Sequence, residues 1–382
     1  MKLLFTGDIN FRGLDSLTLE RSNDILSELA PILASVDYRI PNLEAPLADK
    51  SKHVPIKKSG PNLICDPENM VFLNAFQADG VTLANNHIGD FGEGAAKDTL
   101  ALLDAHHIAH AGAGVNVEEA YRAMYFEKAG TRAAIISVCE NEFGMATKNT
   151  CGSAGYEPRL LLRQIRAEKA NADFVIVVFH GGNEFNPLPS PDTVSRYRLI
   201  CDMGADAVIG GHTHCPQGYE IYDGKPIVYS MGNLFFPQNA AHPAPIEGWY
   251  YGYVSILDIG THVDLQIIPY RFNAESTLIH VFTGDEKAAM LSYIATLSQI
   301  IQDEDELTRY FQGWSWWHSW IPQPPSDLND LSDYNLYGNM NLIYCEAHYS
   351  QTKSVFQTLY NEESALARQY EKKIRQLQKL PV

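Results

Sequence analysis

Two histidines separated by one residue end the segment "VIGGHTH", in which paired glycines follow an apolar run. On an extended segment or across a tight turn, the side chains of His212 and His214 can face one metal ion. Two polar turn residues would show the same spacing. The two interpretations, a metal site and a polar turn, can therefore be told apart only by looking for further ligand residues elsewhere in the chain.

Other residues of suitable chemistry follow further apolar runs. The segment "TLANNHIGDFGEG" contains Asn86, His87 and Asp90. An amide oxygen can bind a metal and a histidine can transfer a proton, whereas the alternative is an asparagine-rich turn that caps the next helix. His180 follows the run in "VVFHGG". A buried histidine with only structural hydrogen bonds is the alternative there.

Carboxylates stand beyond two more apolar runs, with Asp8 in "FTGDIN" and Glu44 in "IPNLEAP". Each alone would be a turn former or a cap. The runs are short and β-branched, with helix-like stretches between them, which indicates an α/β fold with buried strands. Ligands of such sheets usually bind at the carboxyl ends of the strands. Together the strand ends supply a ligand mixture suited to Mn, Fe or Zn: Asp8, Glu44, Asn86, His180, His212 and His214.

The pattern changes towards the C-terminus. Residues 225–272 alternate with period two and predict antiparallel strands that close the sheet, whereas helical stretches are expected near 285–312 and 350–379. We therefore predict a domain over 1–272 and a helical appendage over 275–382 that adds no metal ligand. The segment 311–325 holds four of the five tryptophans. Packing of the appendage is favoured over sugar stacking or a pocket mouth as their role.

Composition limits the partners. The chain of 382 residues has 29 Lys and Arg against 46 Asp and Glu, a net charge of −17, which disfavours nucleic-acid binding. A polyanion would also be repelled unless a bound cation reverses the local field. The six cysteines form no C-x-x-C pair, and no apolar run is long enough for a membrane segment or signal peptide. A cytoplasmic protein is expected.

Six short motifs, read in chain order, resemble those of the CapA family of bacterial capsule and poly-γ-glutamate synthesis proteins, within the calcineurin-like metallophosphoesterase superfamily. They are G-D at 7–8, N-L-E at 42–44, A-N-N-H at 84–87 with a following D and G, H-G at 180–181, G-x-H-T-H ending at 214, and S-M-G-N at 230–233. The resemblance covers residues 1 to about 270. It implies a four-layer α/β/β/α sandwich with two divalent metal ions, Mn, Fe or Zn, between its two sheets.

The resemblance also implies residue roles. His87 would match the catalytic histidine, protonating the leaving oxygen, and Asp90 would orient its ring. The ligands would be Asp8, Glu44 and His214 for the first ion, and Glu44, Asn86, His180 and His212 for the second.

Two positions depart from the wider superfamily pattern. Asn10 replaces the histidine of the usual D-x-H opening, and Glu44 replaces an aspartate. Asn10 is a candidate ligand as well, but an amide binds metals more weakly than imidazole does, so the first ion would be held more loosely.

The sequence thus predicts a metal-dependent hydrolase that acts on a small-molecule phosphoester. One alternative is a component of poly-γ-glutamate or capsule synthesis or processing, with the polymer's carboxylates at the metals. The other is a non-catalytic metal-binding scaffold. The C-terminal helices are a candidate contact for an oligomer.

Overall fold

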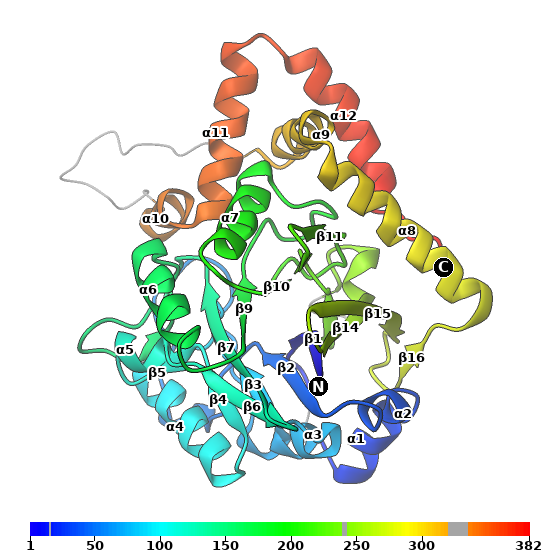
Figure 1. The fold of residues 1–382 in the computed structure, drawn as a ribbon. Helices are drawn as coiled ribbons and strands as arrows, with labels where there is room; N and C mark the ends of the chain where they lie inside the picture. The colour runs from blue at the N-terminus through cyan, green and yellow to red at the C-terminus, as the bar shows by residue number, and fades with distance from the viewer. Residues whose placement is uncertain (15–16, 239–242, 320–334) are drawn as a thin grey trace, which may run out of the picture.

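The computed structural model describes residues 1–14, 17–238, 243–319 and 335–382 (Figure 1). Its first sheet contains β1 (Lys2–Ile9), β2 (Tyr38–Leu43), β3 (Gly80–Thr82), β4 (Ala109–Ala111), β13 (Asn233–Phe235), β14 (Tyr251–Ile259), β15 (Val263–Phe272) and β16 (Ile279–Val281). The strand order is β16-β15-β14-β1-β2-β3-β4, and β13 pairs with β1. β1 to β4 run parallel.

The second sheet contains β6 (Met124–Lys128), β7 (Thr131–Cys139), β9 (Phe174–His180), β10 (Ala207–Gly211), β11 (Tyr219–Tyr222) and β12 (Lys225–Val228). Its order is β11-β12-β10-β9-β7-β6, with β7, β9, β10 and β12 parallel. β5 (Ala113–Gly114) and β8 (Gly152–Ser153) form a separate two-stranded ladder.

Helices in the first two thirds of the chain are α1 (Leu19–Ile25), α2 (Ala30–Leu33), α3 (Met70–Phe76), α4 (Gly92–Ala105), α5 (Val117–Ala120), α6 (Pro158–Glu168) and α7 (Pro191–Asp202). The later helices are α8 (Gly284–Gln302), α9 (Glu304–Trp317), α10 (Leu336–Tyr344), α11 (Glu346–Tyr360) and α12 (Ser364–Leu377). These five gather at one side of the molecule, coloured yellow to red in Figure 1. Within the described ranges, no helix combines the length and the apolar character needed to cross a bilayer.

Alternating side chains of the strands build three separate cores. Phe5 and Val178 point into the core between the two sheets. Their neighbours in sequence point outwards, Leu4 into a core under α1, α3 and α4, and Val177 into a core under α6, α7 and the C-terminal helices. Successive side chains of a strand point to opposite faces of its sheet, so a sheet that is buried on both faces must contribute to two different cores. The predicted four-layer α/β/β/α sandwich with C-terminal helices is confirmed.

Two local predictions were wrong in detail. β12 pairs antiparallel with β11 but parallel with β10, and β13 pairs parallel with β1, so the expected antiparallel strands over 225–272 are only partly present, chiefly as β14 and β15. β16 extends the first sheet to Val281, and the division of the chain near residue 272 stays a prediction. The helix expected over 350–379 is two helices, because Glu362 takes a left-handed conformation with φ of 59° and ends the first.

Candidate metal centre

The predicted ligand residues come together where the two sheets present the carboxyl ends of their central strands. One sheet contributes the end of β1 and the loops after β2 and β3, and the other contributes the ends of β9 and β10. All of the side chains are at most 6% exposed. From the first sheet come Asp8, Glu44 and Asn86, and from the second come His180, His212 and His214.

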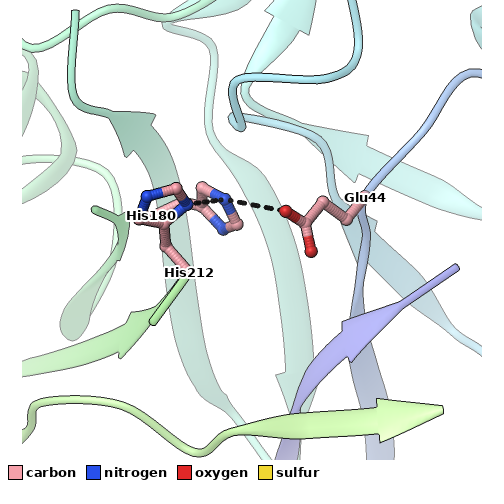
Figure 2. Close-up of side chains that lie close together, drawn as sticks. All are labelled: Glu44, His180 and His212. Carbon is pink, nitrogen blue, oxygen red and sulfur yellow. Dashed lines mark hydrogen bonds and ion pairs between the residues drawn. The ribbon is translucent and has the colours of Figure 1, made fainter. Parts of the chain in front are cut away.

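Glu44, His180 and His212 form one candidate ligand group (Figure 2). Nε2 of His180 lies 3.5 Å from Oε1 of Glu44 and 3.1 Å from Nδ1 of His212. Oδ1 of Asn86 lies 3.2 Å from the same His180 nitrogen. Donor atoms that bind one ion at about 2.0–2.2 Å stand roughly 3.0–3.5 Å apart, so these spacings fit a shared ion.

Asp8, Glu44 and His214 form a second candidate group, which shares Glu44 with the first. Nε2 of His214 lies 3.7 Å from Oε1 of Glu44. The other nitrogen, Nδ1, lies 2.9 Å from Oδ1 of Asn233. Because the amide nitrogen of Asn233 donates to the Trp249 carbonyl, its oxygen accepts from Nδ1–H, and the lone pair of Nε2 remains for a ligand.

The backbone after β10 is strained in a way that turns both imidazoles to the same side. His212 and His214 have φ values of 90° and 55°, in the left-handed region that non-glycine residues rarely occupy. The backbone N–H of His212 donates to Oδ2 of Asp8 at 3.2 Å. On the opposite strand, a Cβ at Gly7 would lie 1.6 Å from the Gly232 carbonyl, so glycine is required for β13 to reach the centre.

Two asparagines position the carboxylates. Asn42 of the N-L-E motif donates from Nδ2 to Oδ1 of Asp8 at 2.7 Å, a contact that the motif alone does not reveal. Asn10 donates from Nδ2 to the Glu44 carbonyl at 2.7 Å, and its Oδ1 accepts from the Arg12 backbone at 2.8 Å. Both polar atoms of Asn10 therefore already have protein partners, and any bond to a metal would be additional to them.

Electrostatics at the centre favour a bound cation. Burial, followed by the charge of Glu44, raises the pKa of Asp8 to about 8. Burial raises the pKa of Glu44 well above its usual value. For the imidazoles, burial lowers the pKa of His214 to about 3 and that of His212 well below normal. Neutral imidazoles have lone pairs available, and positive charge between the carboxylates would stabilise their ionised form.

His87 stands beside the centre and belongs to neither ligand group. Its Nδ1 lies 2.6 Å from Oδ2 of Asp90, as expected, and its Nε2 lies 4.0 Å from Oε1 of Glu44. Lys58, which the sequence did not indicate as a site residue, also lies here. Its Nζ lies 2.5 Å from Oδ1 of Asp90 and 3.3 Å from the His87 Nδ1. Burial, together with the charge of Lys58, lowers the pKa of His87 to about 4.

A cavity of about 730 Å³ opens onto the centre at His87, His212 and His214. Helices α9, α10 and α11 form part of its wall, through residues that include Trp314. Glu346, at the start of α11, fixes this wall by accepting hydrogen bonds from the Asn141 backbone at 2.8 Å and side chain at 2.7 Å. The C-terminal helices therefore shape the site.

The tryptophan segment has a mixed outcome. Trp314 is 2% exposed and packs in the core under the C-terminal helices, which is the favoured role, yet it also lines the cavity, as the alternative proposed. Residues 320–325 of that segment, including Trp320, lie outside the described residues.

In a comparison with known protein families, residues 2–238 match the family described as bacterial capsule synthesis protein PGA_cap. The chain belongs to this family. It is 32% identical over 225 residues to "Capsule biosynthesis protein CapA" of Bacillus anthracis, covering 56% of this chain and 54% of that protein. It is 30% identical over 247 residues to "PGA biosynthesis protein CapA" of Bacillus subtilis, covering 61% and 63%. The match thus spans little more than half of each relative, and it confirms the resemblance to CapA proteins.

Solved structures resemble the PGA_cap chain more distantly. A putative 5'-nucleotidase from Staphylococcus aureus has a TM-score of 0.46 at 14% identity, covering 79% of this chain and 58% of that one. A hypothetical protein from Thermus thermophilus has a TM-score of 0.44 at 17% identity, covering 71% and 99%. Similarity at this level carries no information about function.

Proposed function

We propose that the protein is a metal-dependent hydrolase of the calcineurin-like superfamily that acts on a small-molecule phosphoester. The main support for this proposal is the environment of the Glu44 side chain. Both of its carboxylate oxygens are buried without a hydrogen-bond partner in the protein, and the carboxylate stands between two sets of ligand atoms. A buried carboxylate without donors is costly, whereas divalent cations on either side would compensate its charge.

The proposed ligand sets follow the two groups around Glu44. When bound, two divalent ions supply the positive charge that stabilises a phosphoryl group during transfer. The protein contributes the fixed positions of the ligands, with the tautomer of His214 set by Asn233 and the orientation of Asp8 set by Asn42. The ligands would be Asp8, Glu44 and His214 for one ion, and Glu44, Asn86, His180 and His212 for the other.

His87 is the proposed proton-transfer residue. Asp90 accepts from its Nδ1, which leaves Nε2 as the nitrogen on the side of Glu44. A pKa of about 4 makes the imidazole neutral at pH 7 before substrate binds. An anionic substrate favours the charged form, so its arrival would raise this pKa. Nε2 of His87 would then take up a proton from solvent and give it to the leaving oxygen.

A second candidate is a role in the synthesis or processing of poly-γ-glutamate or another capsule polymer, and the family match and the name of the Bacillus subtilis relative favour synthesis. The same centre would then hold carboxylates of the polymer. The third alternative, a metal-binding scaffold, uses the ligands without His87. These readings differ in substrate and turnover and agree on metal binding.

The test is metal analysis of the purified protein, followed by assays on phosphomonoesters, phosphodiesters and poly-γ-glutamate with Mn, Fe or Zn added. Two ions per chain and turnover of a phosphoester are expected. Glu44→Gln, which keeps the side-chain volume, should lose metal and activity, whereas Glu118→Gln, at an exposed position of α5, should keep both. Cleavage of the polymer alone would favour the second candidate, and bound metal without turnover would favour the scaffold.

A further inference from the structure

His180, a proposed metal ligand, is the last residue of β9. Its backbone is paired with Cys139 of β7 on one side and with Gly211 of β10 on the other. Gly181 and Gly182 follow it, and Gly182 has a φ of 118°, a backbone conformation that suits glycine. We refer to these two residues as the glycine turn. The position of the His180 imidazole therefore depends on what restrains the glycine turn.

Glu140, the residue after β7, restrains the glycine turn at two points. Its backbone N–H donates to the His180 carbonyl at 3.0 Å, and its Oε2 accepts from the Gly182 backbone N–H at 3.1 Å. The side chain also covers Gly181, because a Cβ at that position would lie 2.4 Å from Cγ of Glu140. This close approach requires glycine at 181, which gives a physical reason for the H-G motif at 180–181.

The carboxylate of Glu140 is itself held by other elements. Its Oε1 accepts from Nη1 of Arg196, in α7, at 2.8 Å, and its Oε2 lies 3.6 Å from Sγ of Cys345, between α10 and α11. Glu140 is 2% exposed, so these groups and the Gly182 N–H take the place of water around it. Hydrogen bonds to an ionised carboxylate are roughly twice as strong as neutral ones. The carboxylate is therefore a firm anchor for the glycine turn.

We propose that Glu140 is a positioning residue for metal binding, which holds the glycine turn so that the imidazole of His180 faces the ion it would share with Glu44 and His212 (Figure 2). We call this ion the His180 ion. The inference rests on the metal centre of the proposed function. Glu140 is not among the described residues that form a ligand group or line the cavity, so it acts through the backbone beside His180.

A purely structural ion pair is the alternative, and the chain contains one for comparison. Glu220 is 5% exposed and accepts from Arg198 at 2.9 and 2.8 Å and from the Tyr229 hydroxyl at 2.6 Å. Arg198 lies in α7, as Arg196 does. None of the bonds to Glu220 involves the glycine turn. Glu220→Gln therefore removes a carboxylate of the same kind without touching the backbone of a proposed ligand.

The test is calorimetric titration of the full chain, freed of metal by a chelator, with Mn²⁺. The unmodified protein should bind two ions. Glu140→Gln, which keeps the side-chain volume, should weaken one binding step about 10- to 100-fold, as is typical when a partner outside the ligand shell is removed, and leave the other within about threefold. His180→Ala should abolish the step that Glu140→Gln weakens, which assigns that step to the His180 ion.

Two further variants separate positioning from stability. Glu220→Gln should lower Tm, as Glu140→Gln does, but leave both binding steps unchanged. Arg196→Gln keeps the contact between Glu140 and Gly182 and removes the guanidinium that orients the carboxylate. It should weaken binding of the His180 ion by a smaller factor than Glu140→Gln does, and it tests the inference if Glu140→Gln does not fold.

Four outcomes would overturn the inference. They are an unmodified protein that binds no Mn²⁺, normal binding of both ions in Glu140→Gln, equal losses in Glu140→Gln and Glu220→Gln, and, where Glu140→Gln does not fold, unchanged affinity in Arg196→Gln. Failure of the proposed function has another signature, because Mn²⁺ would then bind with the expected dependence on Glu140 while phosphoesters resisted hydrolysis.

Discussion

Replacing His87 by alanine separates proton transfer from metal binding. The imidazole stands 4.0 Å from Glu44 and outside both ligand groups, whereas His212 stands 3.1 Å from His180 within one. His87→Ala should therefore retain the metal content of the unmodified protein, and His212→Ala should lose metal and activity together. Loss of a general acid typically lowers turnover by about 10² to 10⁴, and a fall of 10² equals about 2.7 kcal/mol of transition-state stabilisation.

The fold should survive this substitution. Asp90 would lose the imidazole but keep the Leu63 backbone N–H at 2.7 Å on Oδ2 and Lys58 at 2.5 Å on Oδ1. Its carboxylate therefore stays compensated. The removed ring lies against a cavity, so the change adds to an existing space and opens none inside a packed core.

The measurements are metal ions per chain and kcat at saturating substrate over a pH series. His262→Ala, at an exposed position, is the matched control and should leave both unchanged. As a general acid, His87 acts in its protonated form, so turnover should be present below the pKa of His87 and lost as pH rises through it. That pKa is about 4 without substrate, and a bound phosphate moves it upward.

Two results would refute this reasoning. Equal loss of metal in His87→Ala and His212→Ala would make His87 a ligand. Unchanged turnover in His87→Ala, with the pH profile also unchanged, would remove the residue from the mechanism and strengthen the scaffold reading.

Three further predictions concern stability. Lys58→Met should leave the Asp90 carboxylate buried and unpaired and lower the free energy of unfolding by about 3 kcal/mol, measured by urea titration; a loss below about 1 kcal/mol would contradict the pairing. Mn²⁺ at a hundredfold excess over its Kd should stabilise the protein by about 2.7 kcal/mol, seen as a rise in Tm that a chelator reverses, and an unchanged Tm would count against a metal site. Hydrogen bonds to Glu286 and Glu28 raise the pKa of His280, so its contribution is fully present below pH about 6.5 and disappears as pH rises through the raised pKa. His280→Gln should therefore lower the free energy of unfolding at pH 6 by no more than about 1 kcal/mol for so exposed a site, seen as a lower Tm, and by much less at pH 9. An equal loss at both pH values would refute the linkage.

The sandwich and the convergence of the ligand residues could be predicted because they depend on local patterns. Short β-branched runs form buried strands, and parallel strands present their carboxyl ends at one edge. Asp8, His180 and His212 each occupy such an end, so strand assignment alone placed them together. The pairing of β12 was not predictable in this way, since alternation does not tell a parallel neighbour from an antiparallel one.

The role of Lys58 and the contact between Asn341 and Glu142 could not be found from the sequence. Lys58 lies in a long loop beside Lys57, and no periodicity distinguishes the buried lysine from its neighbour. Asn341 meets Glu142 across 199 positions of sequence, through a helix whose docking depends on tertiary contacts. Asn42 and Asn233 could have been recognised as residues that support the site, because Asn42 stands in the motif that contains Glu44 and Asn233 ends a motif that accompanies the ligands.

The distribution of charge in the cavity bears on the choice between the candidate functions. Metal ions at Glu44 would make the metal centre positive, whereas the carboxyl groups of Glu142 and Glu184 line the cavity that opens onto it. A run of polymer carboxylates would be attracted at the first and repelled at the second, and the net charge of −17 adds to that repulsion. Under the proposed function, this repulsion would favour a small phosphoester over a long polyanion, because only the polyanion must place many charges beside the cavity carboxyl groups.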